Sequence, residues 1–221
     1  MDELRRVRDI IQGDSYQIRN YDKDAFDYII DIGSNVGQFS FIAHVLFSNA
    51  KIFAYEPCDK SYEVMCISLK GIPNLTLIHK ALGNGEPLYF RESGGVLETC
   101  TGHLFKEKNT GNYKIDSVTL DKIFEENKID LKKKILLKID CEGGEQYLLN
   151  NKYNNILLEC EHISFEAHFP CTKYDNFDDL PTWETYNNWV KEVFTSTYNI
   201  LYHKSSRRRG IGVFVLTKKI R

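Results

Sequence analysis

The sequence predicts an α/β protein with a Rossmann-like, mostly parallel sheet and helices on both of its faces. Apolar strand-like runs alternate with segments of helical periodicity along most of the chain. The first strand-like run, 26–32, leads into a glycine-containing turn and then a helical segment. The last two strand-like segments, 199–203 and 212–216, are joined by a loop too short for a helical crossover, so they must be antiparallel.

The first half of the chain shows this alternation most clearly. Phe39, Ile42, Ala43 and Leu46 follow the spacing of one apolar helix face. The expected elements are a strand at 26–32, a helix at 39–46, a strand at 51–55, a helix capped by Asp59, and a strand at 75–79. Gly71 and Pro73 end the second helix.

The second half continues the pattern after an interruption. Residues 83–113 are rich in glycine and predict hairpins and loop beside the main sheet. The expected elements after it are a short strand, a helix capped by Thr119, a strand at 134–139, a helix through Leu149, a strand at 161–169, a helix capped by Thr182, and the final strand pair. We expect one domain over residues 1–221, with a helical lead-in over about 1–25.

Composition excludes several classes of protein. The chain has 221 residues, 42% of them hydrophobic, which suits one globular domain. A formal charge of -2 gives no general attraction to nucleic acid or to an anionic membrane. No apolar run is long enough to span a bilayer, and the charged N-terminus does not resemble a signal peptide. The six cysteines form no CxxC pair, so we expect reduced thiols, no zinc site and a cytoplasmic location.

Polar residues and glycines gather at the ends of the predicted strands. Ligands of a doubly wound sheet bind at the carboxyl ends of its strands. The residues there are Asp31, Gly33, Ser34, Asn35 and Gly37 after the first strand, Glu56 and Pro57 after the second, Ala81 after the third, Asp140 and Glu142 after the fourth, and Glu166 and His168 after the fifth. We therefore expect the functional site at this edge.

The turn at residues 33–37 indicates which nucleotide binds. Its spacing is G-x-N-x-G, whereas a dinucleotide fingerprint needs G-x-G-x-x-G. Asp31 and Glu56 would repel a pyrophosphate but attract a cation. Glu56 lies 25 residues after Asp31, at the end of the second predicted strand. This is near the spacing at which an acid accepts hydrogen bonds from ribose hydroxyls. S-adenosylmethionine is a sulfonium with an ammonium group, a ribose and no phosphate, so these acids favour it over NAD.

Several motifs resemble one family. "DIGSNVGQFS" at 31–40 and "AYEP" at 54–57 resemble the first two motifs of class I methyltransferases. Four further motifs resemble the FkbM family of methyltransferases: "KALGN" at 80–84, "SVTLDKIF" at 117–124, "LLKIDCEGGEQYLL" at 136–149 and "ISFEAHF" at 163–169. The resemblance covers about residues 27–169. One departure is Cys141, where the family usually has Val, and we expect a buried, unreactive thiol there.

The resemblance carries expectations about fold and cofactor. It implies a class I methyltransferase fold, with a seven-stranded sheet whose last strand is antiparallel. It implies that S-adenosylmethionine is bound by Asp31, Gly33, Asn35, Gly37 and Glu56, with residues near Ala81 flanking the adenine. Ser34, Pro57 and Asp140 complete the predicted cofactor site. The predicted activity is O-methylation of a saccharide-like or other small hydroxyl acceptor, and the alternatives are a binding module without catalysis and an NAD-linked oxidoreductase.

Catalysis needs a group that manages the acceptor's proton. A hydroxyl is a weak nucleophile at neutral pH and needs a base or a metal. His168 is the predicted general base, with Asp140 or Glu142 orienting the acceptor or the base. A metal held by Asp140, Glu142 and His168 is an alternative, but the predicted site has none. Glu145 is expected to favour the N-terminus of its own helix.

Three consecutive arginines raise a further question about the acceptor. Arg207, Arg208 and Arg209 lie in the loop between the last two strands, on the predicted cofactor face. They could hold an anionic acceptor such as a phosphorylated sugar or an RNA end, or they form a solvated hairpin tip.

Overall fold

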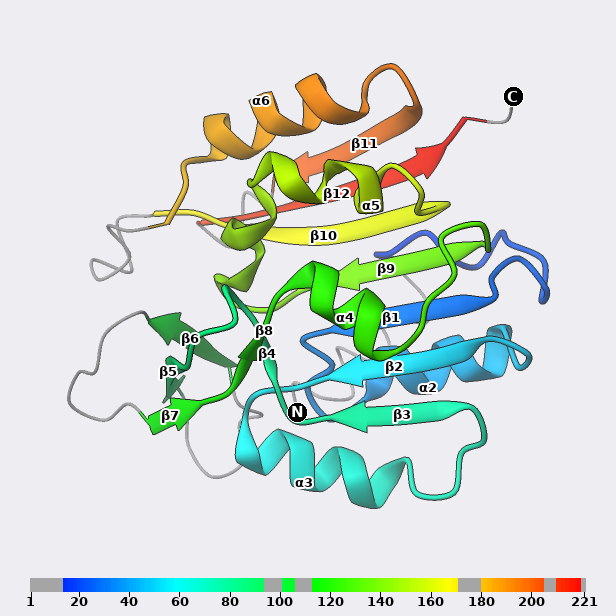
Figure 1. The fold of residues 1–221 in the computed structure, drawn as a ribbon, viewed down its shortest axis with the longest axis vertical. Helices are drawn as coiled ribbons and strands as arrows, with labels where there is room; N and C mark the ends of the chain where they lie inside the picture. The colour runs from blue at the N-terminus through cyan, green and yellow to red at the C-terminus, as the bar shows by residue number, and fades with distance from the viewer. Residues whose placement is uncertain (1–13, 94–100, 106–112, 171–179, 205–209, 220–221) are drawn as a thin grey trace.

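A seven-stranded sheet forms the centre of the molecule in the computed structural model (Figure 1). The structure describes residues 14–93, 101–105, 113–170, 180–204 and 210–219. The strands are, in spatial order, β11 (Tyr198–Lys204), β12 (Ile211–Lys218), β10 (His162–His168), β9 (Ile135–Ile139), β1 (Tyr28–Ile32), β2 (Lys51–Tyr55) and β3 (Leu75–Ile78). The predicted seven-stranded, mostly parallel sheet is confirmed.

The last strand, β12, runs against its two neighbours. It pairs antiparallel with β10 and with β11, and the described pairings with β11 run from Tyr198 opposite Lys218 to Lys204 opposite Gly212. The pairs β1–β2, β1–β9, β9–β10 and β2–β3 are all parallel. The prediction from loop length is therefore correct, and Arg207, Arg208 and Arg209 lie outside the described residues.

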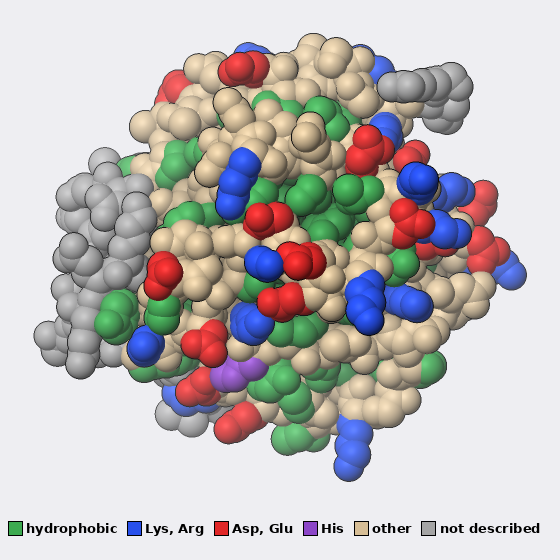
Figure 2. All heavy atoms as spheres, in the orientation of Figure 1, with side chains coloured by type: hydrophobic (Ala, Val, Ile, Leu, Met, Phe, Trp, Pro, Cys, Tyr) green, Lys and Arg blue, Asp and Glu red, His purple; other side chains and the backbone are tan. Residues whose placement is uncertain are grey.

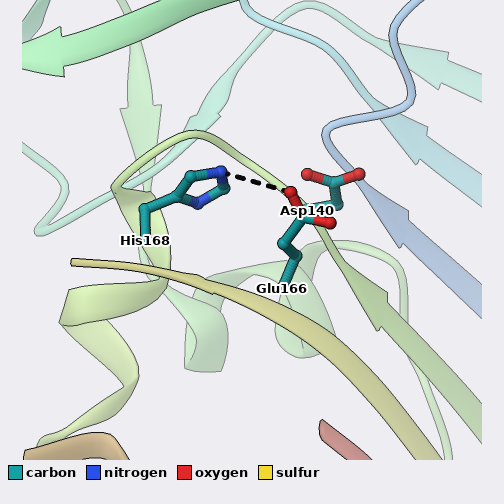
Figure 3. A group of neighbouring side chains, drawn as sticks. All are labelled: Asp140, Glu166 and His168. Atoms are coloured by element: carbon teal, nitrogen blue, oxygen red, sulfur yellow. Dashed lines mark ion pairs between the residues drawn. The ribbon is translucent and has the colours of Figure 1, made fainter. Parts of the chain in front are cut away.

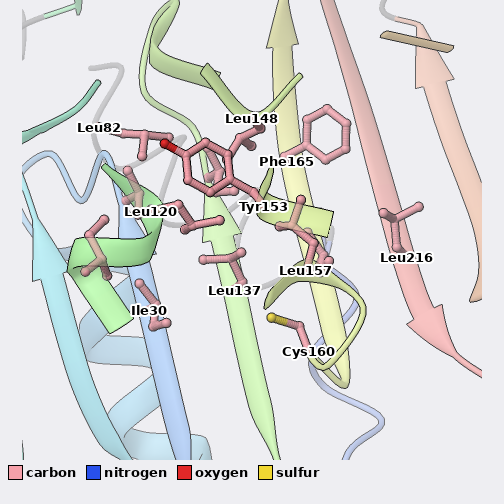
Figure 4. Packing of buried hydrophobic residues seen from close by; sticks show 14 of the residues in the cluster. Ile30, Leu82, Leu120, Leu137, Leu148, Tyr153, Leu157, Cys160, Phe165 and Leu216 are labelled. Atoms are coloured by element: carbon pink, nitrogen blue, oxygen red, sulfur yellow. The ribbon is translucent and has the colours of Figure 1, made fainter. Parts of the chain in front are cut away.

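Helices cover both faces of this sheet (Figure 1). They are α2 (Gln38–Leu46), α3 (Asp59–Ser68), α4 (Leu120–Glu126), α5 (Asn154–Leu157) and α6 (Trp183–Phe194), with the 3-10 helices η1 (Gly144–Leu148) and η2 (Asn151–Tyr153). Neighbouring residues of one strand face opposite sides. Ile30 and Leu137 pack in the cluster that includes α4, α5 and α6 (Figure 4), whereas Ile29 and Leu136 pack in the cluster that includes α2.

A smaller sheet occupies the stretch predicted to hold hairpins. It contains β5 (Leu88–Ser93), β6 (Thr101–Phe105) and β7 (Tyr113–Ile115), with β5 in the middle and both pairings antiparallel. β4 (Ala81–Leu82) and β8 (Ser117–Val118) form a short parallel pair that connects it to the main body. Figure 1 shows the small sheet beyond the carboxyl ends of β1, β2 and β9, at the edge where ligands are expected.

Two local predictions need correction. Residues 14–25 form turns and bends rather than a helix, and Asp14 and Gln17 adopt positive φ angles of 43° and 52°, outside the helical region. The rest of the predicted helical lead-in, residues 1–13, lies outside the described residues. Asp59 is the first residue of α3 and not its cap, since Cys58 holds the cap position. The helix predicted after β9 is present as a 3-10 helix, Gly144–Leu148, with Leu149 at its C-cap. The Thr182 cap of α6 is confirmed, with Thr182 Oγ1 accepting a hydrogen bond from the Thr185 amide.

The surface of the described residues is mixed in charge on the face seen in Figure 2. On the face that carries α4 and α5, acidic and basic side chains are intermixed (Figure 2). No helix among the described residues is long and apolar enough to cross a bilayer. Cys66, Cys141 and Cys160 form no disulfide with another described residue, and Cys141 and Cys160 are buried.

Candidate active site

The turn after β1 is held by backbone hydrogen bonds. The amides of Gly33 and Ser34 both donate to the Tyr55 carbonyl at 2.9 Å, and the Gly37 amide donates to the Ser34 carbonyl at 2.8 Å. Gly33, Asn35 and Gly37 all have left-handed φ angles, of 78°, 53° and 89°. The turn therefore needs residues that tolerate the left-handed conformation, and two of the three positions are occupied by glycine, which adopts it without strain.

The two glycines also leave room for other parts of the chain. A Cβ atom at Gly33 would lie 1.8 Å from the Asp140 carbonyl oxygen, and one at Gly37 would lie 2.4 Å from Leu69 Cδ1. The sequence suggested that these glycines admit a ligand and a tight helix start. The structure shows that Gly33 admits the end of β9, and that Gly37 admits α3.

Glu56 fixes the same turn from the end of β2. Its Oε2 accepts a hydrogen bond from the Asn35 amide and its Oε1 accepts one from the Cys58 amide, both at 2.8 Å. Glu56 is 5% exposed, and this burial raises its pKa to about 7, although the two amides act in the opposite direction. A carboxylate can accept about four hydrogen bonds, so Glu56 retains capacity for a ligand.

Asp31 lies beneath the turn in a buried ion pair. It is fully buried, its Oδ1 lies 3.0 Å from Lys138 Nζ, and its Oδ2 accepts a hydrogen bond from Ser40 Oγ at 2.7 Å. Lys138 Nζ also donates to the Gly33 carbonyl at 2.7 Å. Burial lowers the pKa of Lys138, but the carboxylates of Asp31 and Asp140 shift it above its usual value.

This ion pair changes the argument about charge at the cofactor site. The prediction from sequence treated Asp31 as a free carboxylate and overlooked Lys138. The lysine was visible as the one charged residue in the apolar run 135–139, and strand alternation places it on the same face as Asp31. Asp31 is thus paired with a cation, whereas no cationic side chain among the described residues contacts Glu56. Of the two acids, Glu56 is therefore the one available to a cationic ligand.

The remaining predicted cofactor residues lie at the same edge. Ser34 is buried and its hydroxyl donates to the Asp31 carbonyl at 2.9 Å. Pro57 and Ala81 are also buried, and Ala81 packs in a cluster with Cys58. The fold thus brings together the carboxyl ends of the neighbouring strands β1 and β2, as expected from strands that share one carboxyl edge. Ala81 begins β4, outside this sheet, and packs beside Cys58, which follows β2.

A second group of polar side chains surrounds His168 at the end of β10. Its Nδ1 lies 3.0 Å from Glu145 Oε1, and its backbone amide donates to the same oxygen at 2.7 Å. Its Nε2 lies 3.2 Å from Glu142 Oε2 and 3.4 Å from Glu166 Oε1. Figure 3 shows the ring facing Glu166 and Asp140. We call Asp140, Glu142, Glu145, Glu166 and His168 the histidine cluster.

Sheet geometry explains why these residues meet. β10 pairs in parallel with β9, and Phe165 lies opposite Ile139, the last residue of β9. The next residue of each segment, Glu166 in β10 and Asp140 after β9, therefore lies at the same edge of the sheet. Glu166 and His168 are two residues apart in a strand, and their side chains therefore lie on one face. Asp140, Glu142 and His168 come together as predicted.

Glu145 has a larger role than the sequence indicated. It is fully buried, and its Oε2 accepts a hydrogen bond from the Gly143 amide at 2.9 Å, close to the predicted helix-terminal role. Its other oxygen holds both the backbone and the ring of His168. Glu145 therefore fixes the orientation of the histidine, which the prediction from sequence missed.

Tyr16 reaches the cluster from the N-terminal segment. Its hydroxyl donates to Asp140 Oδ2 at 3.3 Å, and its ring contacts Phe39 edge-on at 5.1 Å between centroids. His162 Nε2 lies 2.9 Å from the Tyr16 carbonyl oxygen. No pattern in the sequence singles out Tyr16, because its contact with Asp140 depends on how the lead-in crosses the sheet.

Burial and crowding shift the protonation of the cluster. Burial lowers the pKa of His168, but the nearby carboxylates of Glu142 and Glu145 raise it by more than burial lowers it. The pKa of His168 therefore lies well above its usual value. Burial raises the pKa of Glu142 to about 7, and burial followed by Glu166 raises the pKa of Asp140. Burial likewise raises the pKa of Cys141 well above its usual value, in agreement with the predicted unreactive thiol.

Comparisons with known proteins point in one direction. The family model of the methyltransferase FkbM domain matches residues 31–189. No curated protein sequence matches the chain significantly.

Solved structures share the fold at low sequence identity. An rRNA-methylase candidate from Clostridium thermocellum has a TM-score of 0.56 at 10% identity, over 94% of each chain. An rRNA methylase from Streptococcus thermophilus has a TM-score of 0.50 at 11% identity, over 94% of this chain and 96% of its own. A precorrin-6y C5,15-methyltransferase from Geobacter metallireducens GS-15 has a TM-score of 0.50 at 12% identity, over 95% of this chain and 87% of its own. At such identities the likeness concerns the fold alone.

Proposed function

The chain belongs to the methyltransferase FkbM domain family, whose model matches most of its length, and from this premise we propose an acceptor class and a division of roles. The protein is an S-adenosylmethionine-dependent methyltransferase with a Rossmann-like fold. We propose that it methylates a hydroxyl of a small, neutral, saccharide-like acceptor. The observation that carries this proposal is the histidine cluster, which borders the glycine turn at the Gly33–Asp140 contact.

The methyl donor occupies the edge formed by the turn and the end of β2. The ribose hydroxyls donate to Glu56, whose carboxylate is already oriented by two backbone amides. Asp31 acts indirectly, because its ion pair with Lys138 supports the Gly33 carbonyl. The proposed donor-binding residues are Asp31, Gly33, Ser34, Asn35, Gly37, Glu56, Pro57, Ala81 and Asp140.

The acceptor lies against the histidine cluster. Methyl transfer from a sulfonium is an in-line displacement, so the enzyme must position the nucleophile and remove its proton. Asp140 leads from the donor edge into the cluster, because its backbone abuts Gly33 and its side chain joins Tyr16 and Glu166. An acceptor hydroxyl beside Asp140 would therefore face the transferred methyl.

The partial exposure of the side chains separates their roles. The side chain of His168 is 6% exposed, and both of its ring nitrogens face carboxylates. The side chain of Glu142 is 29% exposed, so it can contact an acceptor directly. We assign proton removal to Glu142 and acceptor orientation to Asp140, while His168, predicted as the base, holds the carboxylates in place.

The charge of the cluster favours a neutral acceptor with several hydroxyls. Glu142 and Glu166 expose 29% and 20% of their side chains, and Asp140 is also partly exposed. Carboxylates accept hydrogen bonds from hydroxyls, and they repel phosphates and other anions. A sugar-like acceptor suits this surface better than a phosphorylated sugar or an RNA end.

Methyl-labelled S-adenosylmethionine tests the acceptor class. The panel should contain neutral saccharides, a phosphorylated sugar and an RNA oligonucleotide, and we expect label in neutral hydroxyl acceptors. Transfer confined to the phosphorylated sugar or to RNA would overturn the proposal. Glu142→Gln should lower kcat by about 100-fold or more while donor affinity is kept. The exposed Glu159, paired with Lys218, supplies the control Glu159→Gln, which should leave kcat unchanged.

A further inference from the structure

We propose that Asp140, Glu166 and His168 form a binding site for a divalent cation, with Mn²⁺ as the best-matched ion. The sequence predicted a site without metal, and its metal alternative used Glu142 in place of Glu166. The cation binding itself is independent of the acceptor, but its use in methyl transfer rests on the proposed function.

The geometry supports a three-ligand site (Figure 3). Each residue offers one ligand atom, and these atoms all lie within 4.8 Å of one another. Bonds of about 2.0–2.2 Å to a shared ion place its ligand atoms roughly 3–4 Å apart. The pair formed by His168 Nε2 and Glu166 Oε1 already fits this range at 3.4 Å. The Asp140 ligand atom lies within 4.8 Å of the ligand atoms of the other two residues, and the Asp140 side chain is partly exposed.

The histidine has the arrangement of a metal ligand. His168 is 4% exposed, and its Nε2 has no hydrogen-bond partner of acceptable geometry among the described residues, although it points into the cluster. Its Nδ1 faces the buried Glu145 carboxylate at 3.0 Å, and the same oxygen holds its backbone amide. Metal-bound histidines almost always donate their other ring N–H to a carboxylate, carbonyl or water, which fixes the ring and leaves the remaining nitrogen free for the ion.

The balance of charge also favours a cation. Asp140, Glu142, Glu145 and Glu166 surround one imidazole ring, and the neighbouring lysine, Lys138, contacts Asp31 and the Gly33 carbonyl. Such a concentration of carboxylates in a poorly solvated site is costly without a compensating positive charge. A divalent ion between Asp140 and Glu166 would supply that charge where the two carboxylates approach.

The ligand types indicate which ion fits. Two carboxylate oxygens favour Mn²⁺ and Mg²⁺, whereas an imidazole favours transition metals, so the mixed set matches Mn²⁺ better than Mg²⁺. Three protein ligands leave coordination positions open, as in catalytic sites. An acceptor hydroxyl bound at an open position would be acidified by the ion, and its proton would pass to Glu142. Its oxygen would form a bond to the donor's methyl carbon as the bond from that carbon to the sulfonium sulfur breaks, with S-adenosylhomocysteine as the leaving group.

Binding can be measured with Mn²⁺ alone. The full chain, freed of metal with a chelator and dialysed, is titrated with MnCl₂ by calorimetry and by the loss of the free Mn²⁺ signal in electron paramagnetic resonance. We expect one site, and we expect Glu166→Gln and Asp140→Asn to weaken it by at least about tenfold. Glu145→Gln should weaken it by about 10- to 100-fold although Glu145 does not touch the ion.

A control variant separates binding at this site from nonspecific binding of Mn²⁺ to other acidic side chains. Asp59→Asn removes an exposed carboxylate that lies 3.2 Å from His79 Nε2, so it alters a histidine–carboxylate pair outside the cluster. It should leave Mn²⁺ affinity unchanged. Thermal unfolding in chelator confirms that each variant is folded, and Glu166→Gln is the decisive variant because Glu166 is partly exposed.

The results distinguish the cation site from the proposed function. Absence of Mn²⁺ binding, or binding that survives both Glu166→Gln and Asp140→Asn, overturns the cation site. If the protein does not bind Mn²⁺ and still methylates a hydroxyl at full rate in chelator, the cation site is overturned and the acceptor class is supported. Cluster-dependent Mn²⁺ binding without any methylated hydroxyl acceptor supports the cation site and overturns the acceptor class.

Discussion

The turn between β1 and α2 and the histidine cluster at the ends of β9 and β10 share one edge of the sheet, but they satisfy their polar groups differently. In the turn, Glu56 binds backbone amides and Asp31 binds Lys138. In the cluster, several carboxylates face one histidine, and His168 Nε2 has no hydrogen-bond partner of acceptable geometry among the described residues.

This difference separates a preformed site from a site that needs another component. The turn resembles a rigid receptor, whose groups are fixed before the donor arrives. The cluster gathers like charges, which is tolerable when a substrate, a proton or a cation offsets them. Donor binding should therefore depend on backbone conformation, whereas catalysis should depend on the contents of the cluster.

Gly33→Ala should have the largest effect, because it breaks the contact between the two regions. The new Cβ would lie 1.8 Å from the Asp140 carbonyl oxygen, at a φ angle of 78° that disfavours alanine. We expect a loss of more than about 5 kcal/mol in the free energy of unfolding, or no folded protein. Urea denaturation followed by circular dichroism measures this.

Gly71→Ala is the matched control for that variant. Gly71 has a similar φ angle of 83°, but apart from Gly71 and its two chain neighbours no described residue has an atom within 4 Å of the position that a Cβ would take there. Its cost should be only about 1 kcal/mol, from backbone strain alone. Equal losses for the two alanine variants would show that strain, and not the contact with β9, decides the Gly33 position.

Lys138→Met tests the ion pair beneath the turn. The variant leaves the fully buried Asp31 carboxylate unpaired and removes a donor from the Gly33 carbonyl. We expect a loss of about 3 to 5 kcal/mol in the free energy of unfolding. The double variant Asp31→Asn/Lys138→Met should recover part of this loss. If Lys138→Met costs no more than Lys122→Met, at an exposed helix position, the ion pair is not structurally important.

The pH dependence of donor binding tests Glu56. Its pKa of about 7 exceeds its ordinary 4.5, so the ligand-free protein loses stability as pH rises between these values. The ionised form accepts ribose hydroxyls best, and S-adenosylhomocysteine affinity should therefore rise roughly tenfold between pH 6 and pH 8. Calorimetry in two buffers measures it. Glu56→Gln should bind more weakly and without this slope, and a slope that persists in the variant would exclude Glu56 as its source.

The sequence predicted the local parts of both regions and missed the contacts that join distant segments. The turn at 33–37 and the strand-end residues Asp140 and His168 follow from short-range spacing. Lys138 supports Gly33 across 105 positions of the chain, and Tyr16 reaches Asp140 across 124. Such contacts depend on which strands become neighbours and on the path of the lead-in, neither of which leaves a periodic signal.

Tyr16→Phe should have the smallest effect and probes whether the lead-in belongs to the cluster. It removes the hydroxyl that donates to Asp140 and keeps the ring that packs on Phe39. We expect a loss of about 1 kcal/mol in the free energy of unfolding, measured by urea denaturation, and a reduction in kcat. Tyr62→Phe, which removes a hydroxyl that donates to the Leu77 carbonyl at 3.4 Å, should keep kcat. An unchanged kcat in Tyr16→Phe would assign Tyr16 to folding alone, because a hydroxyl that orients the Asp140 carboxylate must affect the acceptor that this carboxylate contacts.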